Sequence, residues 1–436
     1  MEVLTSADTY DYASADFSDL LLFEAFLASS TFGNTDTFVN FGTNRVSPFI
    51  SDSDCDQIGD LVLISTSSII SPRFPILIQS HDVNVTGIIS STSLVRISSC
   101  PNIARIISIG GNGLGTSGSL VISEEELSNI HATNFTVQCS GANSIINVYK
   151  IYSSDVSGIS DLVILDATVG ASISFIESSE FRGLIANAGA GITINGNISS
   201  TLSLLSLDGN ADLSGSDSIT FQSAYLYLSA SGGLTSQLIL QPSSSGSIIG
   251  ILPTYWSSSN GIQIMAPTYI QSGTGKLLLN SDSDSDGFGT MTFGPSGSMN
   301  VISSSGSVEM VAGDIVLQAT SGLHFNDLPV TIQVATSAHG IRLGLNNPGG
   351  VLSLDNTELS LIYTSNSLII GGVNTALISI DGVILMNNAS MIGLWSTASS
   401  SISYVQFIGS DSNFSQPLDV RSTSSLYLSV NLTTLS

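Results

Sequence analysis

Basic residues are scarce in this chain of 436 residues, where Lys and Arg total 9 against 34 Asp and Glu. The net charge of −25 repels phosphate backbones, and a nucleic-acid surface needs a basic stripe rather than isolated positions. The basic side chains stand singly, at Arg45, Arg73, Arg96, Arg105, Lys150, Arg182, Lys276, Arg342 and Arg421. We therefore expect no nucleic-acid partner.

Charged residues of both signs make up only 10% of the chain, whereas hydrophobic residues make up 42%. A surface helix carries a polar or charged face opposite its apolar stripe. Too few charged residues are available to build such faces along the chain. A mainly helical protein is therefore not expected.

Long apolar runs are also missing. The longest run, at residues 20–28, is interrupted by Glu24, and a membrane-spanning helix needs about 20 apolar residues. Met1 is followed by Glu2 and Asp8 rather than by a basic segment, so no secretory leader is recognisable. We expect no membrane insertion.

Cysteine is rare as well, with three residues that all lie in the first third of the chain, at Cys55, Cys100 and Cys139. None of them forms a CxxC pair, so neither a metal knuckle nor a disulfide framework is indicated. Three ordinary buried cysteines are favoured over one bridge with a free thiol.

Short runs of Leu, Ile and Val fill the chain from about residue 60 to residue 390, separated by Ser, Gly, Asn and Asp. This pattern is typical of strands bounded by turns. The runs recur at roughly every 10 to 11 residues, within the spacing found in all-β proteins. Representative runs lie at residues 60–65, 74–79, 162–165, 191–195, 237–241, 276–280, 314–318 and 377–381.

A solenoid accommodates about 30 strands better than a sandwich does, because it adds rungs and buries its core between neighbours. Turn pairs such as Asn195-Gly196 and Asp208-Gly209 suit its tight corners. The predicted fold class is therefore all-β, either a parallel β-helix (β-solenoid) or an intertwined β-fibre. It is accompanied by a short N-terminal arm that contains a helix.

Three regions are predicted. Residues 1–55 form a docking or capping arm, with a helix capped by Ser18 that ends before Gly33. Residues 56–390 form the repetitive solenoid. Residues 391–436 are less regular and rich in aromatics such as Trp395 and Tyr404, which fits a cap or contact region that covers open strand edges.

The segment 191–251 carries a resemblance to known proteins, through Leu204-Leu-Ser-Leu-Asp208 and Tyr225-Leu-Tyr-Leu-Ser229 between Ser- and Gly-rich turns. In this alternation of short apolar runs with Ser- and Gly-rich turns, the segment resembles the β-helical stalks of filamentous-haemagglutinin-like adhesins and the β-stranded fibres of viruses and phages. The resemblance implies a structural role on a surface.

One short motif suggests metal binding. Asp282, Asp284 and Asp286 alternate with serine and precede Gly287, as in the first half of an EF-hand calcium loop. Phe293 occupies the place of the bidentate Glu, so further calcium ligands would have to come from elsewhere. A solvated acidic turn is the alternative. A second set has similar spacing without the glycine, at Asp52, Asp54, Asp56 and Asp60.

Few residues of the chain are candidates for catalysis. Parallel β-helices host carbohydrate-active enzymes, whose sites need clustered acids with a base or two opposed carboxylates. The best set here is His324 with Asp327 and either Glu309 or Asp314. The four histidines, at His81, His131, His324 and His339, lack zinc-site spacing.

These observations predict a non-catalytic structural protein with no catalytic residues and no required cofactor. Calcium, at Asp282, Asp284 and Asp286, is the one candidate ion. It forms an elongated fibre, spike or filament component that is extracellular, on a cell surface or in a virion, with a leaning to a virion fibre or spike. A bacterial adhesin or extracellular filament subunit is the alternative, and a carbohydrate-active β-helix enzyme the second alternative. Expected partners are further copies of the chain, as a trimer or filament, or other surface-assembly proteins, with a glycan or receptor as a contact.

Overall fold

The structure is a computed structural model. It describes residues 25–26, 38–40, 47–50, 60–101, 103–111, 120–168, 170–213, 217–222, 226–231, 236–242, 246–271, 274–303, 305–318, 322–337, 339–344, 352–385, 389–398 and 403–434. These residues form 46 short strands and two short helices. Two compact units comprise Met1–Gly196 with Asp208–Ser214, and Asn197–Leu207 with Gly215–Ser436.

The first unit contains strands β1 to β18 and helix α1. Their bounds are β1 (Ala25–Phe26), β2 (Phe38–Asn40), β3 (Ser47–Ile50), β4 (Leu61–Leu63), β5 (Ser68–Ser71), β6 (Ile76–Gln79), β7 (Val83–Val85), β8 (Ile88–Ser91), β9 (Leu94–Ser98), β10 (Ile106–Ile109), β11 (Leu120–Ile122), α1 (Glu124–Ser128), β12 (Ile130–Ser140), β13 (Ile145–Val148), β14 (Ile159–Thr168), β15 (Ser172–Phe175), β16 (Ser179–Phe181), β17 (Leu184–Ala188) and β18 (Ile192–Ile194).

The second unit contains strands β19 to β46 and helix α2, except for the last residue of β20. Their bounds are β19 (Ile198–Ser200), β20 (Leu205–Asp208), β21 (Ile219–Phe221), β22 (Leu226–Ala230), β23 (Leu238–Leu240), β24 (Ile248–Gly250), β25 (Thr254–Ser258), β26 (Ile262–Ile264), β27 (Thr268–Gln271), β28 (Lys276–Asn280), β29 (Thr290–Phe293), β30 (Met299–Ile302), β31 (Ser307–Val311), β32 (Asp314–Leu317), β33 (Leu323–His324), β34 (Val330–Gln333), β35 (Ile341–Gly344), β36 (Leu352–Leu354), α2 (Asn356–Ser360), β37 (Ile362–Tyr363), β38 (Ser367–Gly372), β39 (Leu377–Asp381), β40 (Ile384–Leu385), β41 (Met391–Ser396), β42 (Tyr404–Ile408), β43 (Ser412–Phe414), β44 (Leu418–Ser422), β45 (Ser425–Leu428) and β46 (Leu432–Thr434).

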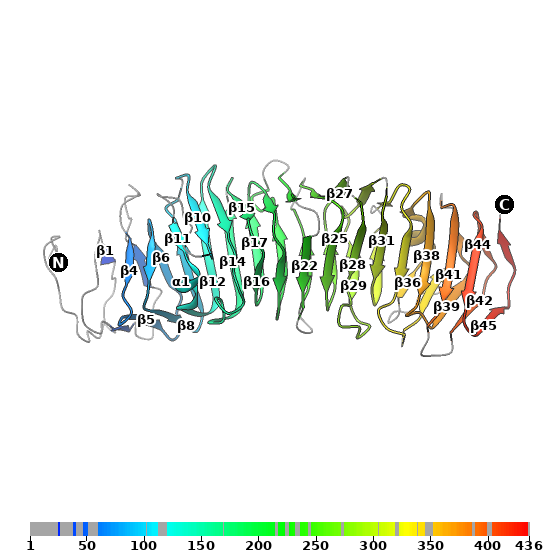
Figure 1. Cartoon of the computed structure of the whole chain (residues 1–436), viewed down its shortest axis with the longest axis horizontal. Helices are drawn as coiled ribbons and strands as arrows, with labels where there is room; N and C mark the ends of the chain where they lie inside the picture. Colours follow the sequence, from blue (N-terminus) through cyan, green and yellow to red (C-terminus); the bar gives the residue numbers. More distant parts are fainter. Residues whose placement is uncertain are drawn as a thin grey trace. The chain divides into compact units, whose positions relative to one another are not determined.

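Parallel pairing between successive rungs builds the first unit. Alternate residues of a strand point to opposite faces, so one apolar residue in two enters the core and stacks on its partner in the next rung. Neighbouring strands lie side by side (Figure 1). One buried row runs through β6, β9, β12, β14 and β17, as Ile76, Val95, Phe135, Val163 and Leu184.

The second unit is built in the same way, with a longer row through β19, β22, β25, β28, β31, β34, β38 and β41. Every residue of this row is at most 1% exposed: Ile198, Leu228, Trp256, Leu279, Met310, Ile332, Ile370 and Leu394. Parallel sheets stacked from rung to rung confirm the predicted all-β class and identify the parallel β-helix.

The helix expected after Ser18 falls almost entirely outside the described residues. The two residues of it that are described, Ala25 and Phe26, form strand β1 and pair in parallel with β3. The helical assignment is therefore wrong at these two positions, because rung pairing overrides the local spacing of apolar residues.

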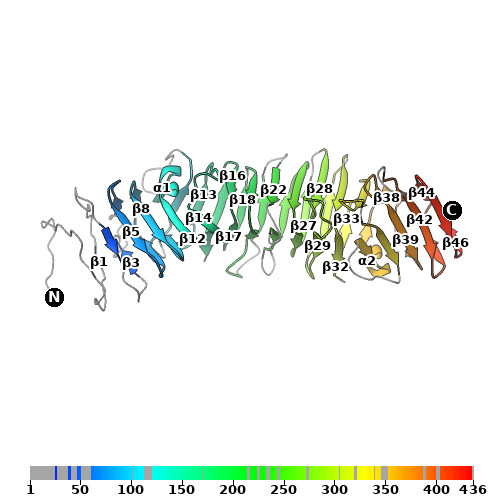
Figure 2. The same cartoon turned by 90° about the horizontal axis from the view of Figure 1, so that it is seen from below.

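Two helices that the strand pattern did not predict stand later in the chain. α1 and α2 have five residues each and lie at the margin of the strands of their own units (Figure 2). Each begins with a capping box, formed by Ser123 with Glu126 in α1 and by Asp355 with Glu358 in α2. Leu127 and Leu359 anchor them in the core.

Cysteine pairing also differs from the expectation of three unbridged thiols, since Cys100 is disulfide-bonded. Cys139 is free and fully buried in β12. Burial, with a smaller contribution from Asp166, raises the pKa of its thiol to about 12. It therefore packs as a small apolar side chain.

Candidate functional site

The predicted metal motif lies in the loop between β28 and β29 of the second unit. The Ser283 amide donates to the Ser258 carbonyl of β25 (2.9 Å) and pins the loop to its surroundings. The Ser281 hydroxyl donates to the Gly289 carbonyl (3.1 Å) and joins the two ends of the loop. Ser285 and Gly287 adopt positive φ angles of 59° and 88°, which turn the chain back on itself. His339 packs against Gly287, where an added Cβ would meet its ring at 2.2 Å.

This turn brings the three predicted carboxylates together. One ligand oxygen from each of Asp282, Asp284 and Asp286 lies within 4.8 Å of the other two. Within the described part of the chain, no other group of three metal-ligating side chains is found. The sequence prediction therefore identified residues that the fold does gather.

The three carboxylates differ in environment. Asp282 is fully buried, whereas Asp284 and Asp286 are exposed. The Gly287 amide donates to Oδ2 of Asp282 (3.0 Å), but its buried Oδ1 has no hydrogen-bond partner. Burial, and then the charges of Asp286 and Asp284, raise the pKa of Asp282 to about 6.

The second acidic set is not assembled among the described residues. Asp52, Asp54 and Asp56 lie outside them, and Asp60 is exposed beside Nδ1 of His81 at 3.2 Å.

The residues of the catalytic alternative serve separate structural contacts. In β33, His324 stacks on Tyr363 of β37 with ring centroids 4.7 Å apart. Asp327 accepts a short hydrogen bond from the Ser365 hydroxyl. In β31, which belongs to a different sheet, Glu309 forms an ion pair with Lys276.

Asp314 begins β32, in a third sheet, and its Oδ1 accepts hydrogen bonds from the amide and hydroxyl of Ser353 (both 3.0 Å). The four residues of the catalytic alternative therefore do not converge on one reacting centre.

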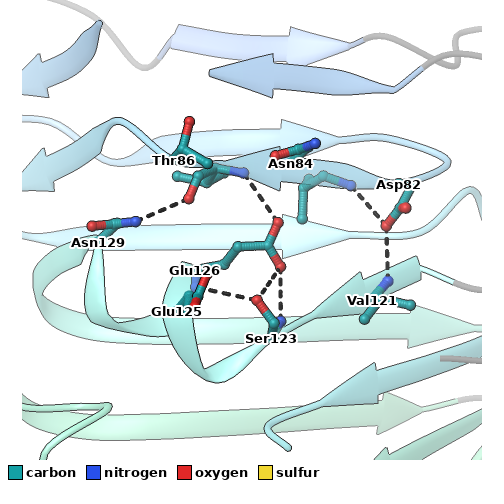
Figure 3. A pocket seen from close by; sticks show the side chains of 10 residues that line it. Asp82, Asn84, Thr86, Val121, Ser123, Glu125, Glu126 and Asn129 are labelled. Atoms are coloured by element: carbon teal, nitrogen blue, oxygen red, sulfur yellow. Dashed lines mark hydrogen bonds between the residues drawn. The ribbon is translucent and has the colours of Figure 1, made fainter. Parts of the chain in front are cut away.

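A cleft of about 450 Å³ lies beside α1 in the first unit. Figure 3 shows Asp82 pointing toward Val121 of β11 and Glu126 pointing toward strand β7. Its lining comes from β7, β11, α1 and the residues that flank them. It combines Val83, Val85 and Val121 with the polar residues Asp82, Asn84, Thr86, Ser123, Glu125, Glu126 and Asn129.

The cleft exists because β7 and β11 are joined by carboxylates rather than by a backbone ladder. Oδ1 of Asp82 accepts from the Val121 amide (2.9 Å), and Oε1 of Glu126 accepts from the Val85 amide (3.0 Å). Nδ2 of Asn129 donates to the Val85 carbonyl (3.0 Å). Three polar residues of the lining, Asp82, Glu126 and Asn129, therefore hold strand edges.

The same arrangement recurs in the second unit. Oδ1 of Asp314 accepts from the Ser353 amide (3.0 Å), and Oε1 of Glu358 accepts from the Leu317 amide (3.1 Å). From 82 to 314 and from 126 to 358, both separations are 232 positions. We call Asp82 with Glu126, and Asp314 with Glu358, the carboxylate clips.

The correspondence extends beyond the clips. Ile173 and Phe175 of β15 match Val405 and Phe407 of β42, again 232 positions later, and all four are buried. The chain therefore carries two copies of one structural pattern, which the sequence reasoning missed. The available signal was the pair of capping boxes, Ser-x-x-Glu at 123–126 and Asp-x-x-Glu at 355–358.

Burial raises the pKa of all four clip carboxyls, against the opposing effect of the backbone hydrogen bonds that they accept. Half-buried carboxylates that accept hydrogen bonds from backbone amides at a strand edge are structural groups, because those bonds replace missing bonds of the strand ladder.

Comparison of the chain with protein-family models, curated proteins and solved structures gave no match. Among the described residues, no helix has both the length and the apolar character needed to cross a membrane.

Proposed function

We propose that the chain is a non-catalytic structural protein that contributes a β-solenoid to a fibre, spike or filament on a virion or cell surface, with the virion fibre or spike favoured. The observation that carries the proposal is the buried row of the second unit, which passes through eight successive strands from Ile198 to Leu394. Each large apolar side chain buried in this way contributes about 1.5 to 3 kcal/mol. Rows of this kind give neighbouring rungs a shared, continuous core.

A partner surface is supported by the strands β44, β45 and β46. The tetrapeptide Leu-Tyr-Leu-Ser occurs at 226–229 and again at 426–429. In β22, Leu226 and Leu228 are at most 4% exposed beneath β25. In β45, Leu426 and Leu428 are 56% and 59% exposed, and no described strand covers them.

We propose that assembly covers these two leucines with a rung from a further copy of the chain or from another assembly protein. Burying the part of these two leucines that is still exposed is worth about 1.7 to 3.5 kcal/mol before the cost of association. A glycan or receptor remains the proposed contact of the assembled particle.

The test is sedimentation velocity with electron microscopy of the purified chain. We expect a trimer or filament, and we expect Leu426→Asp to convert it to monomers. Val373→Asp, which places the same charge at a side chain that is 69% exposed, is the control and should leave assembly intact. A wild-type monomer at all concentrations would contradict the assembly role.

The bacterial adhesin or filament alternative uses the fold in the same way. Neighbouring genes for capsid or portal proteins would support the virion, and genes for a secretion partner would support the adhesin. The carbohydrate-active enzyme is tested with a panel of polysaccharides and product detection. Turnover that is abolished in His324→Ala or Asp327→Asn would overturn the structural proposal.

A further inference from the structure

We propose that the loop at residues 281–289 binds one calcium ion through Asp282, Asp284 and Asp286. The inference rests on this loop alone and does not depend on the scaffold role.

Asp282 has a buried carboxylate oxygen that no hydrogen-bond donor reaches. A buried carboxylate oxygen without a donor costs free energy that a partner normally offsets. Here Oδ1 of Asp282 is buried and unpartnered, and two further carboxylates stand within 4.8 Å. Each charge disfavours the other two, because like charges at this distance repel. A cation placed among the three ligand oxygens offsets this repulsion and gives the Asp282 carboxylate, whose Oδ1 lacks a donor, a positive partner.

No side-chain cation of the described residues fills this role. The ion pairs in that part of the chain join His81 to Asp60, Lys276 to Glu309 and Arg421 to Asp419, and none includes the three loop carboxylates. Lys276, at the start of the strand that leads into the loop, is thus already engaged by Glu309.

The loop is arranged before any ion arrives. The Asp282 amide is bonded to Oδ1 of Asn280 (3.1 Å), and the Phe288 amide to Oδ1 of Asp286 (2.9 Å). The Ser285 amide is bonded to the Asp282 carbonyl (3.2 Å), which closes the turn at its left-handed residue. Little ordering is therefore left for the ion to impose, and preorganisation of this kind favours binding.

The ligand set selects a hard cation. All three side chains offer oxygen only, which suits calcium and magnesium rather than zinc or copper. Two of them are exposed and leave room for water and backbone oxygens, so six to eight ligands of irregular geometry are accessible. Calcium accepts such a shell, whereas magnesium demands a near-ideal octahedron.

The experiment is isothermal titration of the chelator-treated full chain with calcium chloride. The background carries Asp52→Asn, Asp54→Asn and Asp56→Asn, which removes the second alternating acidic set as a source of heat. We expect one site with a dissociation constant of about 0.1 to 1 mM, the range of extracellular calcium modules. We expect Asp284→Asn to weaken binding at least tenfold.

Two further variants separate an ion site from a structural turn. Asp282→Asn should bind calcium at least tenfold more weakly and yet melt at the same or a higher temperature without calcium, because it removes a buried charge. Asp161→Asn removes an exposed charge elsewhere and should bind as the background does. Absence of heat up to about 10 mM calcium, or an affinity unchanged in both loop variants, would overturn the proposal.

Discussion

Glu358 provides a sensitive test of the carboxylate clips. Its Oε1 accepts from the Leu317 amide (3.1 Å) and its Oε2 from the Asp355 amide (3.0 Å). One bond holds β32 beside α2, and the other closes the capping box. The substitution Glu358→Ala removes both acceptors and leaves two amides without their partners.

The expected cost follows from these two bonds. A hydrogen bond to a charged group contributes about 1.5 to 3 kcal/mol. Burial already disfavours the ionised side chain, since it raises the pKa of Glu358, so we take about 1 to 1.5 kcal/mol for each bond. We expect Glu358→Ala to lower the free energy of unfolding by about 2 to 3 kcal/mol. Glu358→Gln keeps one acceptor and should cost about 1 kcal/mol.

Urea denaturation followed by tryptophan fluorescence is the appropriate assay. Both tryptophans of the chain, Trp256 and Trp395, lie in the second unit, so their emission reports on the unit that contains Glu358. With a slope of about 3 kcal/mol per M, Glu358→Ala should shift the midpoint by about 0.7 to 1 M.

The matched control is Thr357→Ala at the neighbouring exposed position of α2. It should change stability by less than about 0.5 kcal/mol. If the midpoints of Glu358→Ala and Thr357→Ala coincide, or if Glu358→Ala stabilises the unit, the clip does not hold the strand edges.

Three further outcomes are expected. Because burial raises the pKa of the clip carboxyls, the native state binds their protons more tightly than the unfolded state does. The free energy of unfolding should therefore rise as the pH falls from 7 toward the ordinary carboxyl range. A steady decline in urea midpoints over this pH range would refute the expectation. Trp256→Ala should lower the free energy of unfolding, measured by circular dichroism, by about 3 to 5 kcal/mol, whereas Trp256→Phe, which removes a buried indole N–H without a partner, should cost far less. Cys139, with a thiol pKa of about 12, should resist iodoacetamide at pH 8 in the folded chain and react after unfolding, as mapped by mass spectrometry; modification of the native protein would contradict its burial.

Strand positions were predictable because alternation is local. The runs around Leu61 and Ile192 show the inward residues directly, and the structure buries them. The three loop aspartates were predictable for the same reason, since their spacing of two along one turn keeps them close. The register, that is, which strand pairs with which in the next rung, was not predictable. Every rung carries similar inward residues, mostly Leu, Ile and Val, so many pairings look equally favourable.

The internal correspondence was hidden by small shifts in length. Ile130 and Ile362 are 232 positions apart, but their rung partners Ile89 and Leu323 are 234 apart. Insertions of two residues at turns keep the strand pairing while they break the sequence periodicity. The helices were missed although both capping boxes are visible, because five-residue helices leave no apolar periodicity.

The carboxylate clips have a consequence for how such a chain changes length. Because each clip reproduces the same bonds between a strand edge and a capped helix, a cut after residue 121 rejoined at residue 354 would restore the sequence order of strand, capping box and helix. Segments of about this size are therefore exchangeable units whose ends are already compatible. Lengthening or shortening by whole segments would change the number of rungs without requiring a new kind of core.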